Sequence, residues 1–309
     1  MSEATSTRTF SVRRRLQNPV AVKELRSRMR GRRAFVVLTL YLLLLGGVLT
    51  LVYLAYNASS ITGISAATVR TAGKSVFGAV LAVQVFLVLF IGPAFTAAAI
   101  SGERERQTYD LLRTTLLSAE SFVRGKLISA LSYVFLLVLV SVPLQSIAFL
   151  LGGLSLTELV VSQLLILLAA VTYALYGLWC SATMRSTLAA TVATFAGTLF
   201  MTAGIPLFAL TAAVVLTPLF NTIATTGSMT EDLLFYGGLV LAAINLPATL
   251  ILSEAFLLQG GTVFSLSQTV SGLSVWLPSP WLLFIVFHVL AAFLLYRATV
   301  RRVRRVSEV

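Results

Sequence analysis

The densest group of ionisable side chains in this 309-residue sequence lies in a polar segment, residues 101–126, between two apolar segments. This segment contains five of the 23 basic residues and four of the 11 acidic residues. The whole sequence is 58% apolar and 11% charged, whereas about 25% of the residues in a soluble domain are charged. A loop with this many charged residues, in a chain that is otherwise so apolar, predicts a docking surface for another molecule.

A short amphipathic helix is expected within this loop. Glu103 and Glu105 would lie in its first turn, where the helix dipole stabilises negative charge. Asp110 follows them in the sequence. One face of the helix would carry four side chains at i, i+3, i+7 and i+8: Tyr109, Leu112, Leu116 and Leu117. Such a face suits a groove on a partner protein, and the alternative is a helix that lies on the lipid surface.

Elsewhere the residues that could perform catalysis are few. The sequence has one histidine, His288, and one cysteine, Cys180, and each lies in an apolar run where side-chain packing is the simpler explanation. No second histidine or cysteine and no carboxylate pair in these runs could complete a metal or hydrolytic site. We therefore expect no catalytic residue, no metal site and no cofactor bound by this chain. The apolar runs also hold almost no charged residues, which argues against ion-coupled transport.

A row of threonines forms the second candidate feature. Five of them lie on one helical face, within an arc of about 80°: Thr187, Thr191, Thr194, Thr198 and Thr202. Helix packing is one explanation, because threonine bonds its own i−4 carbonyl and small side chains allow close approach. The other is that this face lines a path between two protomers.

The apolar segments that must position these residues are continuous and rich in leucine, valine and alanine, which predicts membrane-spanning helices and not barrel strands. There are seven candidates, at residues 34–56, 76–100, 127–151, 158–181, 187–217, 233–257 and 277–298.

The basic residues predict the orientation of these helices. If the N-terminus is inside, 21 of the 23 basic residues lie on the inner side, and only Arg70 and Lys74 lie on the outer side. Both termini are then cytoplasmic, and the number of crossings is even. This distribution accounts for the net charge of +12 without a nucleic-acid partner.

Residues 233–257 are the segment expected not to cross. They contain Asn245-Leu246-Pro247 at their centre and Glu254 near their end. A proline removes a helix hydrogen bond, and a charge within a span costs about 2.5–3.5 kcal/mol on insertion scales. We expect a re-entrant or interfacial helical hairpin on the outer side and six crossings. The alternative is eight crossings, with 187–217 divided near Pro206.

The predicted fold is therefore an all-α polytopic protein of the cell membrane, with six transmembrane helices and an outer re-entrant segment before the last span. Residues 1–16 are expected to be a disordered basic tail, and 17–33 an amphipathic elbow helix on the inner membrane surface. Residues 34–298 form the transmembrane domain, and 299–309 a second basic tail.

Two stretches of the sequence resemble a known family. Residues 17–33 contain Asn18, Pro19, Lys23, Glu24, Leu25 and Arg26. The polar loop then contains Glu103, Glu105, Thr108, Asp110, Leu111, Leu112, Thr115, Leu117, Ser118, Gly125 and Lys126. In this order and topology they resemble the permeases of the ABC-2 transporter type. The resemblance covers the first 130 residues, and it departs at Gln107, where the family often has glycine before threonine.

The resemblance implies the membrane subunit of an ATP-driven exporter. A separate cytoplasmic ATPase would bind ATP and Mg²⁺, and a second permease subunit would complete the path in the membrane lipid. Residues 101–126 would contain the helix that couples to the ATPase, and Lys23, Glu24 and Arg26 would belong to the elbow helix. A different class remains as the alternative, a membrane scaffold that transports nothing and recruits cytoplasmic partners through its basic surface.

Overall fold

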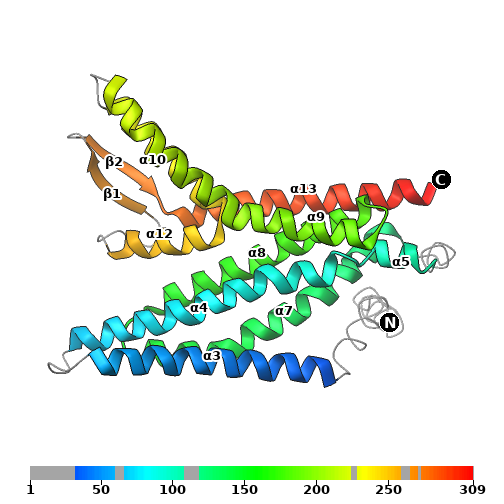
Figure 1. Ribbon diagram of the computed structural model, residues 1–309, viewed down its shortest axis with the longest axis horizontal. Helices are drawn as coiled ribbons and strands as arrows, with labels where there is room; N and C mark the ends of the chain where they lie inside the picture. Colours follow the sequence, from blue (N-terminus) through cyan, green and yellow to red (C-terminus); the bar gives the residue numbers. More distant parts are fainter. Residues whose placement is uncertain are drawn as a thin grey trace, which may run out of the picture.

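In the computed structural model, six long apolar helices pack into one bundle (Figure 1). The structure describes residues 32–59, 66–107, 118–223, 228–258, 265–270 and 273–308. Each is long and apolar enough to cross a membrane. They are α3 (Arg32–Ser59), α4 (Ala66–Thr96), α7 (Ala119–Leu150), α8 (Leu156–Thr183), the continuous α9 (Thr187–Leu199), η1 (Phe200–Gly204) and α10 (Ile205–Ile223), and α13 (Pro280–Glu308). The predicted all-helical polytopic membrane fold is confirmed.

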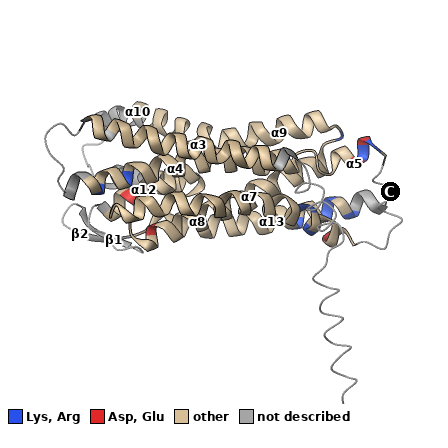
Figure 2. Cartoon of the chain, turned by 90° about the horizontal axis from the view of Figure 1, so that it is seen from below, with Lys and Arg blue, Asp and Glu red and all other residues tan. Residues whose placement is uncertain are grey.

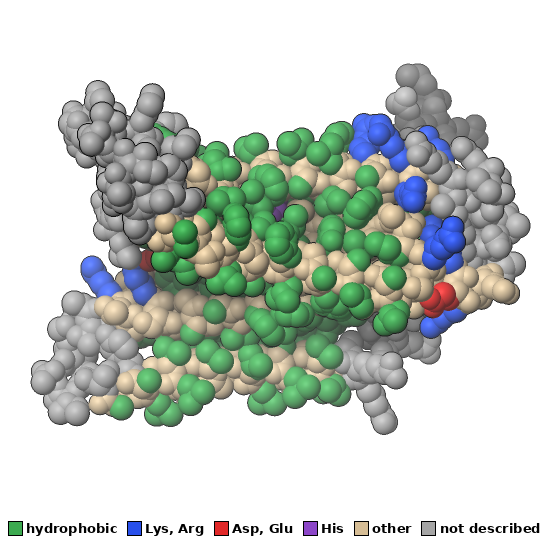
Figure 3. Space-filling model, turned by 45° about the horizontal axis from the view of Figure 1, so that its top comes forward, with side chains coloured by type: hydrophobic (Ala, Val, Ile, Leu, Met, Phe, Trp, Pro, Cys, Tyr) green, Lys and Arg blue, Asp and Glu red, His purple; other side chains and the backbone are tan. Residues whose placement is uncertain are grey.

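Helix α8 lies at the centre of the bundle and packs against α4, α7, α9 and α13. The largest core cluster joins side chains of these helices, among them Val85, Leu165 and Phe284. The outer faces are also apolar, and Phe35, Phe86 and Phe208 are exposed there. A broad surface of hydrophobic side chains separates the two charged ends (Figure 3). Apolar side chains exposed on this scale are stable against hydrocarbon and not against water.

Three buried glutamines form a polar layer within this apolar core. Gln84 of α4 donates to Gln163 of α8, Gln163 donates to Gln145 of α7, and Gln145 donates to Gln84, each at 2.8 Å. Each amide therefore gives and accepts one hydrogen bond, which removes the cost of burying it in a medium without water. The ring fixes α4, α7 and α8 in one register.

The two ends of the bundle differ in charge. Helix α3 begins and α13 ends at the same end (Figure 1), which carries most of the described basic residues (Figure 2). We call it the basic end: Arg104, Arg106, Arg124, Lys126, Arg185, Arg297, Arg301, Arg302 and Arg304. Arg70 and Lys74 lie near the start of α4 at the opposite end, which also carries a two-stranded sheet (Figure 1), and we call it the sheet end. This separation matches the one expected from the sequence.

The segment expected to re-enter forms two short helices, α11 (Ser228–Ile244) and α12 (Leu246–Leu258), which meet at Asn245. The Asn245 side chain caps α12 by accepting from the backbone of Ala248. Its amide donates to the carbonyls of Met201 and Thr202 at 3.0 and 2.6 Å. These carbonyls belong to η1, a π-helical turn, whose wider spacing frees backbone groups. Asn245 thus docks the helical hairpin on the middle of the α9–α10 helix.

That helix bends at η1 and continues without a break through Pro206, so residues 187–223 form one crossing. The eight-crossing alternative, which required a division near Pro206, does not describe the structure. A π-helical turn followed directly by proline accounts for a bend without a second crossing.

A short antiparallel sheet, which the sequence analysis did not predict, lies at the sheet end. It pairs β1 (Ser265–Val270) with β2 (Leu273–Pro278), and Val270 is the partner of Leu273. The signal that could have found it is the turn dipeptide Ser271-Gly272 between two short runs that contain valine, threonine and tryptophan, residues typical of strands.

Three helix boundaries differ clearly from those expected. Helix α13 (Pro280–Glu308) extends ten residues past the expected end at residue 298, through most of the expected basic tail, and two other helices begin early. Helix α4 begins at Ala66 instead of residue 76, so Arg70 and Lys74 belong to a helix. Helix α7 begins at Ala119 instead of residue 127, because Ser118 caps it by accepting from the backbone of Ser121. Polar residues hid these extensions, since a hydropathy window ends where charges begin, although the helix continues.

Candidate functional site

The short helix α5 (Ser101–Glu105) occupies the start of the predicted docking loop at the basic end. Its first contact is with α8. The backbone amides of Ile100 and Ser101 donate to the Ser181 hydroxyl at 2.9 and 3.0 Å. Both serines are fully buried. The beginning of α5 is therefore fixed to the last turns of the central helix.

Arg104 makes the second contact with α8. Its guanidinium donates to the carbonyl of Ala182 at 3.0 Å and approaches that of Met184 at 3.5 Å. The last carbonyls of a helix have no intrahelical partner and carry partial negative charge, so a cation is favoured there.

Glu105 binds the beginning of α9 in the complementary way. Its carboxylate accepts from the backbone amide of Thr187 at 2.7 Å and from the Thr187 hydroxyl at 2.9 and 3.0 Å. These hydrogen bonds, from the backbone amide and from the hydroxyl, stabilise the charged form of the carboxylate. An anion also suits the positive end of the helix dipole.

Glu103 connects α5 to α7. Its carboxylate is 2.9 Å from the ammonium of Lys126, whose side chain is only 7% exposed, against 29% for Glu103. The Lys126 ammonium also lies over the Phe122 ring, 5.6 Å from its centroid. An almost buried cation needs such neighbours, because burial without them is costly.

Together these contacts join one five-residue helix to three others, and we call the set the α5 clamp: Ser101, Glu103, Arg104 and Glu105 on α5, and Lys126, Ser181, Ala182 and Thr187 on α7, α8 and α9. The sequence analysis found the two carboxylates but assigned them to a partner protein. In the structure both bind within the chain, to residues 23 and 82 positions away.

The other residues of the predicted coupling helix, Tyr109, Asp110, Leu112, Leu116 and Leu117, lie outside the described residues. The same holds for Lys23, Glu24 and Arg26 of the predicted elbow helix and for residues 1–16. The clamp therefore holds one end of the docking loop at α5, and Ser118 begins α7 at its other end.

Gln107 has a backbone conformation that glycine adopts more easily than glutamine. Its φ of +56° lies in the left-handed region, and it is the only non-glycine residue of the described chain with a positive φ. Glycine adopts this conformation without the steric cost of a Cβ atom.

Replacing Gln107 with glycine is expected to stabilise the chain, by about 0.5–1 kcal/mol, because the steric cost at positive φ exceeds the extra entropy of an unfolded glycine. Denaturant unfolding of the purified chain in detergent micelles measures the change. Gln107→Ala keeps a Cβ atom and serves as the control, with no gain expected. A loss of stability in the glycine variant would mean that the positive φ carries no strain.

The threonine row faces different surroundings along its length. Thr194 and Thr198 are buried, and each donates to a carbonyl four residues earlier. A Cβ atom added to Gly177 of α8 would lie 3.3 Å from the Thr194 methyl, so the two helices touch there. Helix packing accounts for these two residues, whereas a path between protomers needs them on the surface. Thr191 and Thr202 are half-buried.

Among the described residues no group of three or more histidine, cysteine, aspartate or glutamate side chains is placed to hold a metal ion. Cys180 is buried near the end of α8, and His288 stacks on Phe284 within α13.

Comparison with known proteins adds no assignment: no family model matches this chain, and no curated protein is similar enough to indicate a family.

Proposed function

We propose that this chain is the membrane-spanning subunit of an ATP-driven exporter of the ABC-2 type. A pair of such subunits forms the translocation path, and a separate cytoplasmic ATPase binds the loop at residues 101–126. The chain itself hydrolyses nothing. The basic end faces the cytoplasm of the cell, as the positive-inside rule requires, and the sheet end faces outward.

The α5 clamp is the observation that carries this proposal. A partner that pulls or pushes the docking loop acts on α5, and α5 is bonded to the ends of α7, α8 and α9. Movement of one short helix is thus transmitted to three membrane helices, including the central one. Hydrogen bonds and ion pairs between rigid helices are the kind of contiguous network that carries such coupling.

The distribution of charge within the membrane gives a second argument. In the described parts of the six long helices, the acidic and basic side chains lie toward the two ends of the bundle (Figure 2), and Lys74, Lys126 and Glu158 are among them. Transporters driven by ions or protons use charged groups at the membrane centre. A transporter without them needs energy from a partner, and the resemblance of residues 17–33 and 101–126 to ABC-2 permeases supports an ATPase as that partner.

The test is co-purification of the chain from its own host, followed by measurement of ATP hydrolysis. We expect an ATPase with a Walker motif to be recovered with it. Replacing Leu112 and Leu116 together with aspartate places charge on the predicted apolar face of the loop, and it should lower recovery of the ATPase at least tenfold. The amount of permease in the membrane should stay the same.

Arg70→Glu at the sheet end is the matched control, since it changes charge by the same two units at the opposite surface. Its recovery of the ATPase should equal that of the unchanged chain. A chain that recovers cytoplasmic proteins but no ATPase would instead support the scaffold alternative. Equal recovery with the aspartate variant would remove the loop as the docking site.

A further inference from the structure

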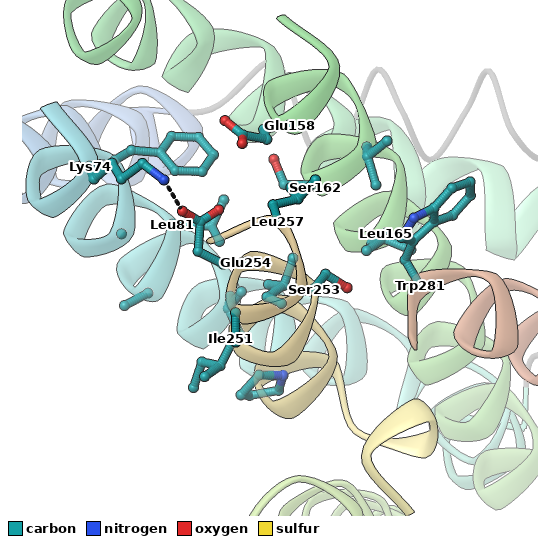
Figure 4. Close-up of a pocket in the computed structure, with 18 of the residues that line it drawn as sticks. Lys74, Leu81, Glu158, Ser162, Leu165, Ile251, Ser253, Glu254, Leu257 and Trp281 are labelled. Atoms are coloured by element: carbon teal, nitrogen blue, oxygen red, sulfur yellow. Dashed lines mark hydrogen bonds and ion pairs between the residues drawn. The ribbon is translucent and has the colours of Figure 1, made fainter. Parts of the chain in front are cut away.

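A large cavity lies between α4, α8 and α12 in the half of the bundle toward the sheet end (Figure 4). Its volume is about 830 Å³, within the range of about 300–1,000 Å³ that is usual for ligand pockets. On α4 its lining extends from Lys74 to Leu89. At 1.5 Å per residue this is a length of about 22 Å, which matches the depth of one leaflet with its headgroup region, about 20–22 Å.

The walls of this cavity are apolar along most of that length. Leu81, Val85 and Leu165 line it and are buried. Phe86 and Ile251 also line it but are 60% and 69% exposed, so the cavity is open toward the outer face of the bundle between α4 and α12. That face is the one in contact with membrane hydrocarbon. An acyl chain can therefore enter from the side without crossing a polar barrier.

The cavity has charged groups at its sheet end only. Lys74 of α4 and Glu254 of α12 form an ion pair at 2.5 Å, and each side chain remains 35% exposed. Glu158 of α8 lies at the same end (Figure 4). Its carboxylate is held in place because it accepts from the backbone amide of Ser155 at 2.8 Å. One cation and two carboxylates thus stand where a lipid headgroup would lie.

We propose that this cavity binds one phospholipid of the outer leaflet with a zwitterionic, ammonium-bearing headgroup. One acyl chain lies along Leu81 and Val85, the phosphate binds Lys74, and the ammonium lies between Glu158 and Glu254. Both signs of charge on the headgroup find an opposite charge on the protein. An anionic headgroup without an ammonium would leave two carboxylates facing it. The proposal concerns this chain alone and does not depend on an ATPase partner.

The experiment measures lipid binding to the purified full chain in non-ionic detergent by native mass spectrometry. Phosphatidylethanolamine and phosphatidylglycerol with the same acyl chains are the two probes. We expect one molecule of phosphatidylethanolamine to be retained, with an affinity at least tenfold higher than that of phosphatidylglycerol. Gly78→Phe should lower the affinity for phosphatidylethanolamine at least tenfold, because Gly78 lines the cavity and a Cβ atom added to it meets no other atom within 4 Å, so the ring can occupy the cavity.

Gly47→Phe is the matched control, because Gly47 is an exposed helical glycine of α3 with equally free space, and it does not line the cavity. Its lipid binding should be unchanged. The pair of substitutions Lys74→Met and Glu254→Gln removes both partners of the ion pair together, so that neither is left without the other, and it should reduce the tenfold preference to less than threefold.

Three results would overturn the proposal. Equal binding of the two lipids to the unchanged chain would remove the headgroup site. Undiminished binding in Gly78→Phe would place the lipid elsewhere. A chain that retains neither lipid and purifies as a dimer would assign the cavity to contact with a second copy.

The two proposals can fail separately. A chain that recovers no ATPase and still binds phosphatidylethanolamine would contradict the proposed function and leave this lipid site intact.

Discussion

Replacing Gly153 with alanine is expected to lower the free energy of unfolding by about 3 kcal/mol, at the upper end of overpacking effects. Gly153 lies between α7 and α8, where the chain crosses the first turns of α4. A Cβ atom there would be 2.6 Å from the backbone oxygen of Arg70 and 2.6 Å from the backbone nitrogen of Lys74. These are backbone atoms of a helix, which cannot rotate away as a flexible side chain would. Either α4 or the α7–α8 turn must move.

The neighbouring glycine supplies the control. Gly152 has a φ of +72°, but a Cβ atom added to it meets no atom within 4 Å. Gly152→Ala should therefore cost only the left-handed conformation, about 1 kcal/mol. Denaturant unfolding in micelles compares the two variants. Gly153→Ala should also weaken phosphatidylethanolamine binding, because either movement displaces a charged group of the headgroup site: Lys74 with α4, or Glu158 with the start of α8. Equal destabilisation by both substitutions would show that the close approach of the backbones is not real.

The sequence was sufficient for the membrane helices because hydropathy is a local property. A span is recognised from its own residues, and so was the interruption of 233–257, where Asn245, Pro247 and Glu254 break an apolar run. The helix ends were less certain. Ser118 and the first turns of α4 are polar, and they extend helices beyond the limits of their apolar segments.

The contacts at the two functional regions could not be derived in this way, because they join distant parts of the sequence. Glu105 and Thr187 are 82 positions apart, and Lys74 and Glu254 are 180 positions apart. Their charge indicated that Glu103 and Glu105 bind donor groups, and a second protein could supply those groups. The folded chain supplies donor groups of its own, since the end of α8 and the beginning of α9 present opposite partial charges at the same surface. Only the packing of α7, α8 and α9 shows which groups within the chain lie close enough to bind these carboxylates.

Glu103→Gln is expected to destabilise the chain by about 2–3 kcal/mol. Breaking a buried pair costs about 3–5 kcal/mol, and the exposure of Glu103 to solvent, 29%, reduces this. The remaining cation, Lys126, is almost buried. Lys126→Met removes that cation and keeps the length of the stem. This substitution should cost less, about 1 kcal/mol, because the carboxylate that remains can be hydrated.

The double variant Glu103→Gln with Lys126→Met distinguishes the ion pair from general damage. If the carboxylate mainly offsets the desolvation of Lys126, the double variant should be about as stable as the unchanged chain, with a coupling energy of about 2 kcal/mol or more. The exposed pair Glu120 and Arg124 lies at the start of the same helix, with atoms 3.0 Å apart and side chains 49% and 59% exposed. The same cycle there should give about 0.3–0.5 kcal/mol. Equal coupling energies would mean that burial of Lys126 does not strengthen its pair, and that the α5 clamp holds α7 no more firmly than a surface contact.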